Sequence, residues 1–382
     1  MASKTIAKFE HALQDAKHIT ERINDAPKIS IENFIGYISV PVGLAGPLSI
    51  KNFDGTSTAT YAPIATTESA IIASCSRGCK VLNESGGGQF HILGEAMSRS
   101  PVFRFNCTQD AINFTHRVRD LWDPIVEAAE STSRYARLLK MTPHILGSNV
   151  HLRFDYTCGD AAGHNMVTIA TQSVCEWLLA STQDLELKIT GFLIEGNMAP
   201  DKKPSWGTVS STRGVGVITW TSLSDTVCRA VLKCTTESLY HTFCTMREGG
   251  IRNGQFGSNI NVANVVTGIF IATGQDVPAV AEGPWGHLTP EYDHESRQLK
   301  LTLYLPSLPV GTVGGGTGYE TQREALGIMG CSGPGMKFRL AGLIAAFSLA
   351  LEISTGAAGA NNTFTKSHER LARVKQGDDS KL

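Results

Sequence analysis

The sequence predicts an α+β protein built as a large domain with a smaller domain inserted into it. At 382 residues, the chain is longer than one ordinary domain. Its 42% hydrophobic and 18% charged residues form a globular composition with ample apolar material for a core. Between about residues 102 and 193, short strand-like and helical patterns take over, which indicates the insertion.

The first elements are a helix, two strands and a second helix. Ile6, Phe9 and Leu13 begin an apolar stripe at helical spacing, and acidic residues there exclude a signal peptide, so we expect a docking helix. "ISVPVGLAGPLSI" (38–50) is typical of strand, turn and strand. "TTESAIIASCSRGCKVLNES" (66–85) predicts a buried helix that Thr66 or Thr67 caps, with Glu68 in its first turn.

The later elements follow the same logic. "HLRFDY" (151–156) alternates as a half-buried strand does, "GDAAGHN" (159–165) is a turn, and a helix follows from Met166. Residues 299–329 predict a strand, a glycine-rich loop and a helix. "MKFRLAGLIAAFSLALEIS" (336–354) predicts a long apolar helix, and "TGAAGANNTFT" (355–365) predicts a loop after it.

Composition narrows the functional class. A net charge of −1 argues against a broad nucleic-acid or membrane surface, and no apolar run that we identify reaches the ~20 residues of a membrane span. Nine scattered cysteines predict reduced thiols and an intracellular compartment. Cys75 and Cys79 could share a helix face, but nothing completes a zinc pattern, so no metal is expected. The chain ends in Ser380-Lys381-Leu382, an address for the peroxisomal import receptor; otherwise we expect a cytoplasmic protein.

Several stretches could carry chemistry, although each has an ordinary structural explanation. "GDAAGHN" before a helix suits a phosphate, but it lacks the G-x-G-x-x-G fingerprint and a tight turn explains it equally. "VGTVGGGTG" (310–318) is not an ATP-binding loop. Lys202 and Lys203 are either a solvated turn or cations facing an anionic substrate. Asp276 could merely follow a helix, and His368 could be structural.

The combination of motifs is more specific than any one of them. In chain order they are "ENFIGYISVPVGLAGPL", "APIATTESAIIASCSRGCK", "GDAAGHNM", "DKKP", "IATGQD", "GTVGGGTG" and "KSH". Together they resemble the hydroxymethylglutaryl-CoA reductases over residues 28–373, in the form found in eukaryotes without the membrane anchor, or a diverged paralogue of it. The resemblance implies a large substrate domain (31–101 and 194–355) and an inserted ferredoxin-like, non-Rossmann NADP-binding domain (102–193). It also implies an N-terminal helical segment (1–30) and a C-terminal flap with the targeting tail (356–382).

The resemblance also implies an activity and four catalytic residues. The family reduces an acyl-CoA thioester to an alcohol with NADPH and releases CoA. By motif, Lys202 resembles the lysine that stabilises the oxyanion, and Asp276 the aspartate that joins this lysine to the glutamate. Glu68 resembles the catalytic acid, which burial or a partner carboxylate must keep protonated. His368 resembles the histidine that protonates the CoA thiolate.

Binding residues and assembly follow from the same resemblance. The implied substrate-binding positions are Arg99, Glu195, Lys203 and Asn264. The implied cofactor-binding positions are Ser133, Arg134, Asp160, Ala161, Gly163, Asn165, Met166 and Arg373. "ENFIG" resembles the dimerisation segment, and sites in this family lie across a subunit interface, which implies a homodimer or tetramer.

Some positions depart from the family pattern, above all Glu195, where a serine is usual. A carboxylate there would repel a carboxylate on the substrate, unless Glu195 neutralises Lys203, accepts a hydrogen bond from the substrate, or points away. The other departures are Ser69, Thr157, Ala162, His164 and Asn261. They leave two alternatives open: a non-reductive thioester or enolate reaction in secondary metabolism (lyase, hydrolase or cyclase), and a non-catalytic CoA-ester or nucleotide-binding protein.

Overall fold

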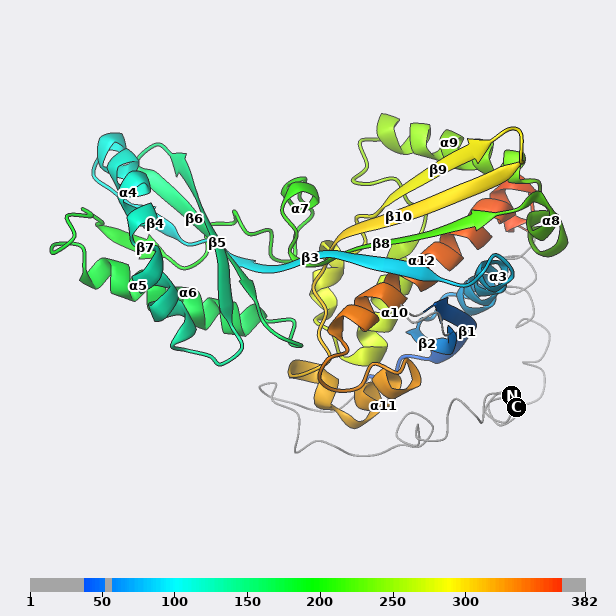
Figure 1. The fold of residues 1–382 in the computed structure, drawn as a ribbon, viewed down its shortest axis with the longest axis horizontal. Helices are drawn as coiled ribbons and strands as arrows, with labels where there is room; N and C mark the ends of the chain where they lie inside the picture. The colour runs from blue at the N-terminus through cyan, green and yellow to red at the C-terminus, as the bar shows by residue number, and fades with distance from the viewer. Residues whose placement is uncertain (1–37, 52–56, 366–382) are drawn as a thin grey trace, which may run out of the picture.

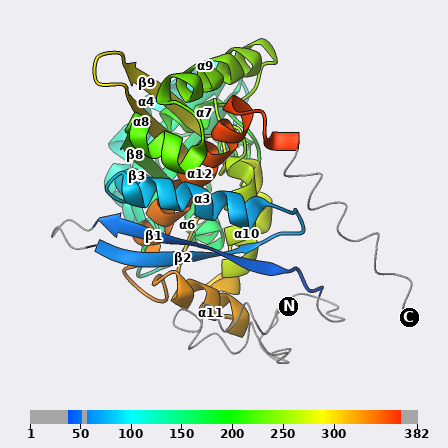
Figure 2. The same ribbon diagram turned by 90° about the vertical axis from the view of Figure 1, so that its right-hand side faces the viewer.

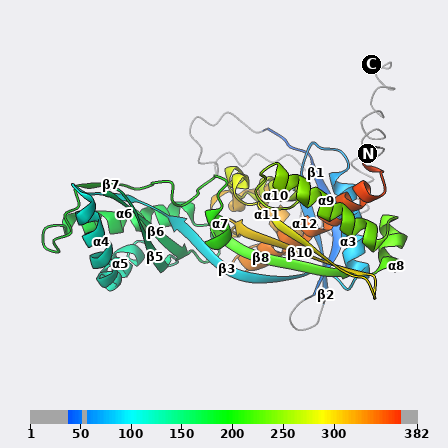
Figure 3. The ribbon, with the colours of Figure 1, turned by 90° about the horizontal axis from the view of Figure 1, so that it is seen from above.

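The computed structural model describes residues 38–51 and 57–365, and it has two lobes joined by one long strand (Figure 1). That strand is β3 (Gln89–Arg99). Residues 89–96 of β3 pair with β8 (Gly214–Leu223) in one lobe, and residues 97–99 pair with β6 (Asn149–Thr157) in the other. Seen from above, β3 passes from lobe to lobe without a break (Figure 3). The predicted docking helix, "ENFIG", His368, Arg373 and Ser380-Lys381-Leu382 lie outside the described residues.

The small lobe has a βαββαβ order. Its elements are β4 (Val102–Arg104), α4 (Thr108–Asp120), α5 (Trp122–Glu130), β5 (Arg137–Leu146), β6, α6 (His164–Ala180) and β7 (Gly191–Leu193). The strands lie in the order β7-β4-β6-β5, and every pair is antiparallel. This arrangement is ferredoxin-like, as predicted. Phe103, Phe114 and Phe154 are buried in the core of this lobe.

The large lobe continues the sheet and adds two further layers (Figure 2). β8 pairs with β10 (Gln298–Leu308), which pairs with β9 (His287–Asp293). Helix α12 (Lys337–Ala360) packs against β8 and against α3 (Ile71–Glu84), and α3 packs on the hairpin β1 (Val42–Lys51) and β2 (Ser57–Ala65). The remaining elements are α7 (Gly207–Ser210), α8 (Asp225–Val227), η3 (Cys228–Leu232), α9 (Thr236–Arg252), α10 (Val262–Thr273), η4 (Val277–Ala281), η5 (Gly315–Gly318) and α11 (Glu320–Ile328).

Helix α12 is the central element of the large lobe. It is long and apolar enough to cross a membrane, but its most apolar stretch is entirely buried inside the protein, which is typical of a core helix. Close packing depends on glycine, since a Cβ at Gly78 would lie 1.8 Å from the backbone oxygen of Ala350. The predicted loop at 355 was wrong, because the helix continues to Ala360. There Gly356 packs so closely on Phe243 that a Cβ would lie 2.6 Å from its ring.

Two other local predictions were wrong. Residues 42–51 form one strand with a register shift between Ala45 and Leu48 in place of strand, turn and strand. Pro47, which cannot donate to the ladder, lies at that irregularity. Helix α3 begins at Ile71 and not near Thr66, because the Thr66 hydroxyl accepts a hydrogen bond from the Glu68 N–H (3.0 Å) and holds a turn before the helix.

All nine cysteines are free thiols, as expected. Seven of them are buried; Cys107 is exposed and Cys244 is half-buried. Cys75 and Cys79 share the buried face of α3, as the sequence predicted. Burial raises the pKa of the Cys79 thiol well above its usual value, so this thiol is held in its unreactive protonated form.

Candidate active site between the lobes

The centre of the site is an ion pair between Lys202 and Asp276. Lys202 lies on the loop between β7 and α7, and its Nζ is 2.9 Å from Asp276 Oδ2. Both side chains are partly exposed, at 43% and 30%, so they remain accessible to a ligand. The backbone of Lys202 is in the left-handed region (φ 57°), and its N–H donates to Glu282 Oε1 (3.2 Å). Such a conformation is uncommon and costly for a residue other than glycine.

Asp276 is held by the glycine-rich loop that the sequence singled out. Helix α10 ends at Gly274 in the left-handed conformation, which turns the chain toward the site. The Gln275 side chain then forms two hydrogen bonds with the backbone of Gly311, at 2.8 and 2.9 Å. "VGTVGGGTG" is therefore a close-packing loop that supports Asp276.

Next to the ion pair lies a group of three charged residues that sequence reasoning missed, of which Arg213 and Glu282 are completely buried and Asp201 is half-buried. Arg213 is completely buried; its Nη1 contacts Glu282 Oε1 (2.5 Å) and its Nη2 lies 2.9 Å from Asp201 Oδ1. Burial raises the pKa of Glu282. Burial also opposes ionisation of Asp201, but Arg213 and the other nearby cations outweigh it and lower the pKa of that carboxyl. Their separation along the sequence gave no signal that they would meet.

Arg99 and Glu195 form a second ion pair beside the first. Arg99 lies at the end of β3, where this strand enters the small lobe, and its Nη1 is 2.8 Å from Glu195 Oε2 and 3.4 Å from Asp201 Oδ2. The other Glu195 oxygen accepts the Asn197 N–H (2.7 Å). Glu195 therefore points into the site and binds Arg99.

Lys203 does not pair with Glu195, so that alternative was wrong. Its Nζ donates to the backbone oxygen of Asp201 (3.0 Å), and its side chain is exposed. Glu195 instead binds Arg99, because the tight turn that ties its other oxygen to the Asn197 N–H fixes the carboxylate toward β3. Of the two lysines, Lys202 is paired with a carboxylate and Lys203 faces solvent.

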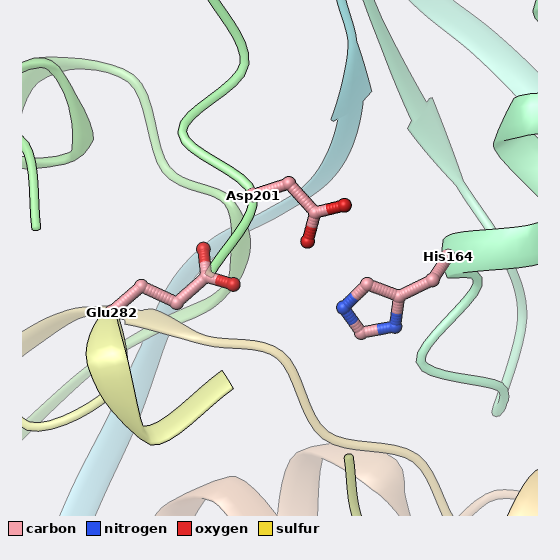
Figure 4. A group of neighbouring side chains, drawn as sticks. All are labelled: His164, Asp201 and Glu282. Atoms are coloured by element: carbon pink, nitrogen blue, oxygen red, sulfur yellow. The ribbon is translucent and has the colours of Figure 1, made fainter. Parts of the chain in front are cut away.

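His164 faces this cluster from the small lobe. It is the first residue of α6, and its Nε2 lies 3.9 Å from Asp276 Oδ2. Its ring points toward Asp201 and Glu282 (Figure 4). Burial, and next to it the positive charge of Arg213, lowers the pKa of His164 to about 4, although Asp201 and Asp276 act in the opposite direction. The imidazole is therefore neutral at neutral pH.

His164, Asp201 and Glu282 also have the donor types of a metal site. One ligand atom of each lies within 4.8 Å of the others. However, the guanidinium of Arg213 pairs with both carboxylates, so their negative charge is already balanced by an arginine.

The predicted dinucleotide turn lies next to His164. Gly163 adopts a φ of 93° and precedes α6, which has no side-chain cap. Buried Lys337 anchors the turn from α12, since its Nζ donates to the backbone oxygens of Gly159 (3.1 Å) and Ala161 (2.9 Å). The Thr312 N–H donates to the backbone oxygen of Asp160 (2.8 Å). The turn is thus tied to the large lobe and to the loop that supports Asp276.

The other predicted cofactor residues that the structure describes lie close to this turn. Asn165 is exposed and Met166 is half-buried in the first turn of α6. Ser133 and Arg134 lie between α5 and β5, and Arg134 is exposed, with its guanidinium 5.8 Å from the ring centroid of Tyr135. A Cβ at Gly159 would lie 3.6 Å from the Tyr135 ring, so the Arg134 loop adjoins the turn.

Glu68 and Asn264 lie in a different place. Both line a cavity of about 360 Å³, together with Ser69, Arg77, Thr355 and Phe364. Asn264 is in the first turn of α10 and Asp276 lies beyond its last, so the length of this helix, about 18 Å, separates them. Glu68 is exposed, and the burial expected for it is not found within one chain. One chain therefore does not join Glu68 to Lys202 and Asp276.

A buried carboxylate binds two of the residues that line this cavity. Glu352 on α12 accepts the backbone N–H groups of Ile260 (2.8 Å) and Asn261 (2.7 Å) at the start of α10. Burial raises the pKa of Glu352 to about 7 in spite of these hydrogen bonds. Asn261, one of the departures from the family pattern, donates through Nδ2 to the Thr355 hydroxyl (2.7 Å).

Comparison with known proteins agrees with this architecture. The sequence profile of hydroxymethylglutaryl-coenzyme A reductase matches residues 3–373. The 3-hydroxy-3-methylglutaryl-coenzyme A reductase of Methanocaldococcus jannaschii is 35% identical over 362 residues, covering 94% of this chain and 89% of the relative. The enzyme of the same name from Haloferax volcanii is 38% identical over 91% of this chain and 86% of its own.

Solved structures show the same fold. The class II 3-hydroxy-3-methylglutaryl-CoA reductase of Streptococcus pneumoniae, solved bound to NADPH in open conformations, superposes with a TM-score of 0.72 at 18% identity. The match covers 92% of this chain and 95% of that one. With the family profile and the two archaeal relatives, it identifies this chain as a member of the hydroxymethylglutaryl-coenzyme A reductase family of oxidoreductases.

Proposed function

We propose that the protein reduces an acyl-CoA thioester to an alcohol with NADPH and releases CoA, acting on hydroxymethylglutaryl-CoA or a related thioester. The observation that carries this proposal is the Lys202–Asp276 ion pair, 2.9 Å long, beside the predicted dinucleotide turn in a chain of this family. An ammonium group held there by a carboxylate can stabilise negative charge as it develops on the thioester oxygen.

The residues around the turn suit a dinucleotide. Helix α6 begins without a side-chain cap, so its first backbone N–H groups are available to a phosphate at the positive end of the helix dipole. The exposed Arg134 adjoins the turn and has the planar donor set that binds a phosphate dianion. NADPH, when bound, would supply the hydride. Lys202 would bind the carbonyl oxygen. Because His164 is neutral, it places no second positive charge beside Asp276 that would compete with the Lys202 ammonium group.

The separation of Glu68 from Lys202 supports a homo-oligomer. Glu68 and Asn264 line a partly open cavity at one end of α10, and Lys202 and Asp276 lie at the other end. A second copy of the chain that brings its Glu68 to this chain's Lys202 would complete the catalytic set. Such an exchange between two identical surfaces fits a two-fold symmetric dimer.

The test is to mix purified protein with NADPH and a panel of acyl-CoA thioesters. NADPH oxidation and the release of free CoA thiol are followed together. We expect both with at least one thioester, and we expect Lys202→Ala to abolish both. Release of CoA without NADPH oxidation would instead favour a non-reductive reaction, and no change with any thioester would refute the proposal.

We also propose peroxisomal import through Ser380-Lys381-Leu382. The test is the distribution of a fluorescent protein fused to the N-terminus of the chain, with and without these three residues. Import of the full chain only would support the proposal, and identical distributions would refute it.

A further inference from the structure

The most informative group in the site is Glu195, because both of its carboxylate oxygens are bound by the protein. Oε2 contacts Arg99 Nη1 at 2.8 Å, and Oε1 accepts the Asn197 N–H at 2.7 Å. The Arg99 side chain is 10% exposed and that of Glu195 is 24% exposed. The Arg99 guanidinium is thus almost buried, whereas the Glu195 carboxylate that binds it remains partly accessible to a ligand.

The backbone keeps Glu195 in this position. The next residue, Gly196, donates its N–H to the backbone oxygen of Ser100 (2.7 Å), immediately after Arg99. A Cβ on Gly196 would lie 2.1 Å from Val102 and 2.6 Å from His151, so the loop is pressed against the start of β4. Glu195 cannot leave Arg99 without breaking this packing or losing both of its hydrogen bonds.

Three cations of the site already have carboxylate partners. Arg213 pairs with Glu282 and Asp201. Arg99 pairs with Glu195 and Asp201, and Lys202 pairs with Asp276. Among the described residues, this leaves Lys203 as the one cation of the group without a carboxylate partner, and its side chain is exposed. A carboxylate on the acyl group would be a further anion beside a guanidinium that two carboxylates already contact. Like charges placed together in this way disfavour binding strongly.

We propose that Glu195 supplies from the protein the carboxylate partner of Arg99, and that the enzyme therefore accepts acyl-CoA thioesters whose acyl group is uncharged and carries a hydroxyl or amide donor toward Glu195. This inference rests on the proposed reduction and specifies its substrate class. Each Glu195 oxygen has one protein partner and retains a lone pair, so the carboxylate can accept a hydrogen bond from the acyl group. Exposed Lys203 is a weak alternative anchor for a carboxylate, because solvent screens it.

The experiment compares two thioesters of the same shape. One is hydroxymethylglutaryl-CoA, and the other is its analogue with the distal carboxylate replaced by a carboxamide. Dissociation constants of both are measured by calorimetry, and kcat/KM by NADPH oxidation. The variants are Glu195→Ser and the isosteric Glu195→Gln, with Glu127→Ser as the control that removes one exposed glutamate from α5 of the small lobe.

We expect the wild-type protein and Glu127→Ser to prefer the amide by about 100-fold or more, since an unmatched charge is rejected strongly. Glu195→Ser and Glu195→Gln should shift the ratio toward the carboxylate at least tenfold, about 1.4 kcal/mol. A wild-type preference for the carboxylate, or a ratio unchanged in both variants, would overturn the inference and assign the carboxylate to Lys203.

The binding measurement separates this inference from the proposed function. If no thioester is reduced by any variant, the proposed reduction fails, and the ratio of dissociation constants still decides the role of Glu195. If thioesters are reduced but the Glu195 substitutions leave the ratio of the two dissociation constants unchanged, the proposed reduction stands and the inference fails.

Discussion

At the scale of single residues, the two adjacent lysines of the site have different surroundings. Lys202 adopts a left-handed backbone and pairs with Asp276, whereas Lys203 contacts only a backbone oxygen among the described residues. We expect Lys202→Ala to lower kcat at least ~100-fold, the usual cost of removing one group that stabilises an oxyanion. Lys203→Ala should lower kcat far less. Equal losses in steady-state assays of both variants would contradict the assignment.

His164 offers a residue-scale prediction about charge. Burial and Arg213 lower its pKa to about 4, below the ordinary 6.5. The neutral imidazole therefore stabilises the fold above about pH 6.5, and this contribution is lost as the pH falls toward 4. An NMR titration should show one histidine with an apparent pKa near 4 that is missing from His164→Gln. A titration of that signal near 6.5 would show that the ring is solvated.

Sequence reasoning identified the charged motif residues and one of their ion pairs, but not the others. Lys202 and Asp276 pair as the resemblance implied. Arg213 and Glu282 were missed, because their pairing depends on a long-range fold and neither has a local pattern. The partner of Glu195 could not be predicted for the same reason. Whether Glu195 binds Arg99 or Lys203 depends on where β3 ends relative to the loop between β7 and α7.

At the scale of elements, patterns predicted which segments are helical better than where the helices start and stop. The apolar run of α12 was recognised, but its extension to Ala360 depends on tertiary packing of Gly356 against Phe243, which no local propensity reports. The predicted start of α3 was too early, because the Thr66 hydroxyl accepts a hydrogen bond within a turn that precedes the helix and does not cap the helix.

The contact between α3 and α12 gives a stability prediction. A Cβ at Gly78 would lie 1.8 Å from the Ala350 backbone oxygen, so Gly78→Ala should destabilise the fold by ~1–3 kcal/mol or more. Gly249 lies in α9, where an added methyl group would meet nothing within 4 Å, and Gly249→Ala should stabilise by ~0.5–1 kcal/mol. Urea unfolding of both variants is the measurement, and a neutral Gly78→Ala would disprove the close helix crossing.

Glu352 ties α12 to the start of α10 and should make stability depend on pH. Its pKa is raised to about 7 from an ordinary 4.5, so its stabilising contribution is complete below about pH 4.5. This contribution is lost as the pH rises through about 7, and it amounts to roughly 3 kcal/mol. Glu352→Gln should flatten the dependence of the unfolding free energy between pH 5 and 8, whereas Glu127→Gln on the surface should not. An unchanged pH dependence of the unfolding free energy in Glu352→Gln would show that another group causes it.

At the scale of the whole molecule, two lobes share one strand and two parts of the site lie at opposite ends of α10. β3 places Arg99 at the junction of the lobes, and Lys337 ties the predicted dinucleotide turn to the large lobe. The ferredoxin-like lobe was predicted through family resemblance. The resemblance implied a site across a subunit interface, but it did not state that Glu68 and Asp276 are the residues separated within one chain, because spacing along a sequence does not show which residues meet.

The most direct test of a site shared between two chains is complementation between two inactive variants. Glu68→Gln and Lys202→Ala are produced with different affinity tags, separately and together, and the doubly tagged oligomer is purified before NADPH oxidation is measured with the best thioester. Each variant alone should be inactive. A co-assembled population should recover about a quarter of wild-type activity if chains mix at random, and the isolated mixed dimer about half, because one of its two sites is intact. Doubly tagged oligomers that remain inactive would contradict the shared site, since Glu68 and Lys202 would then have to act within one chain.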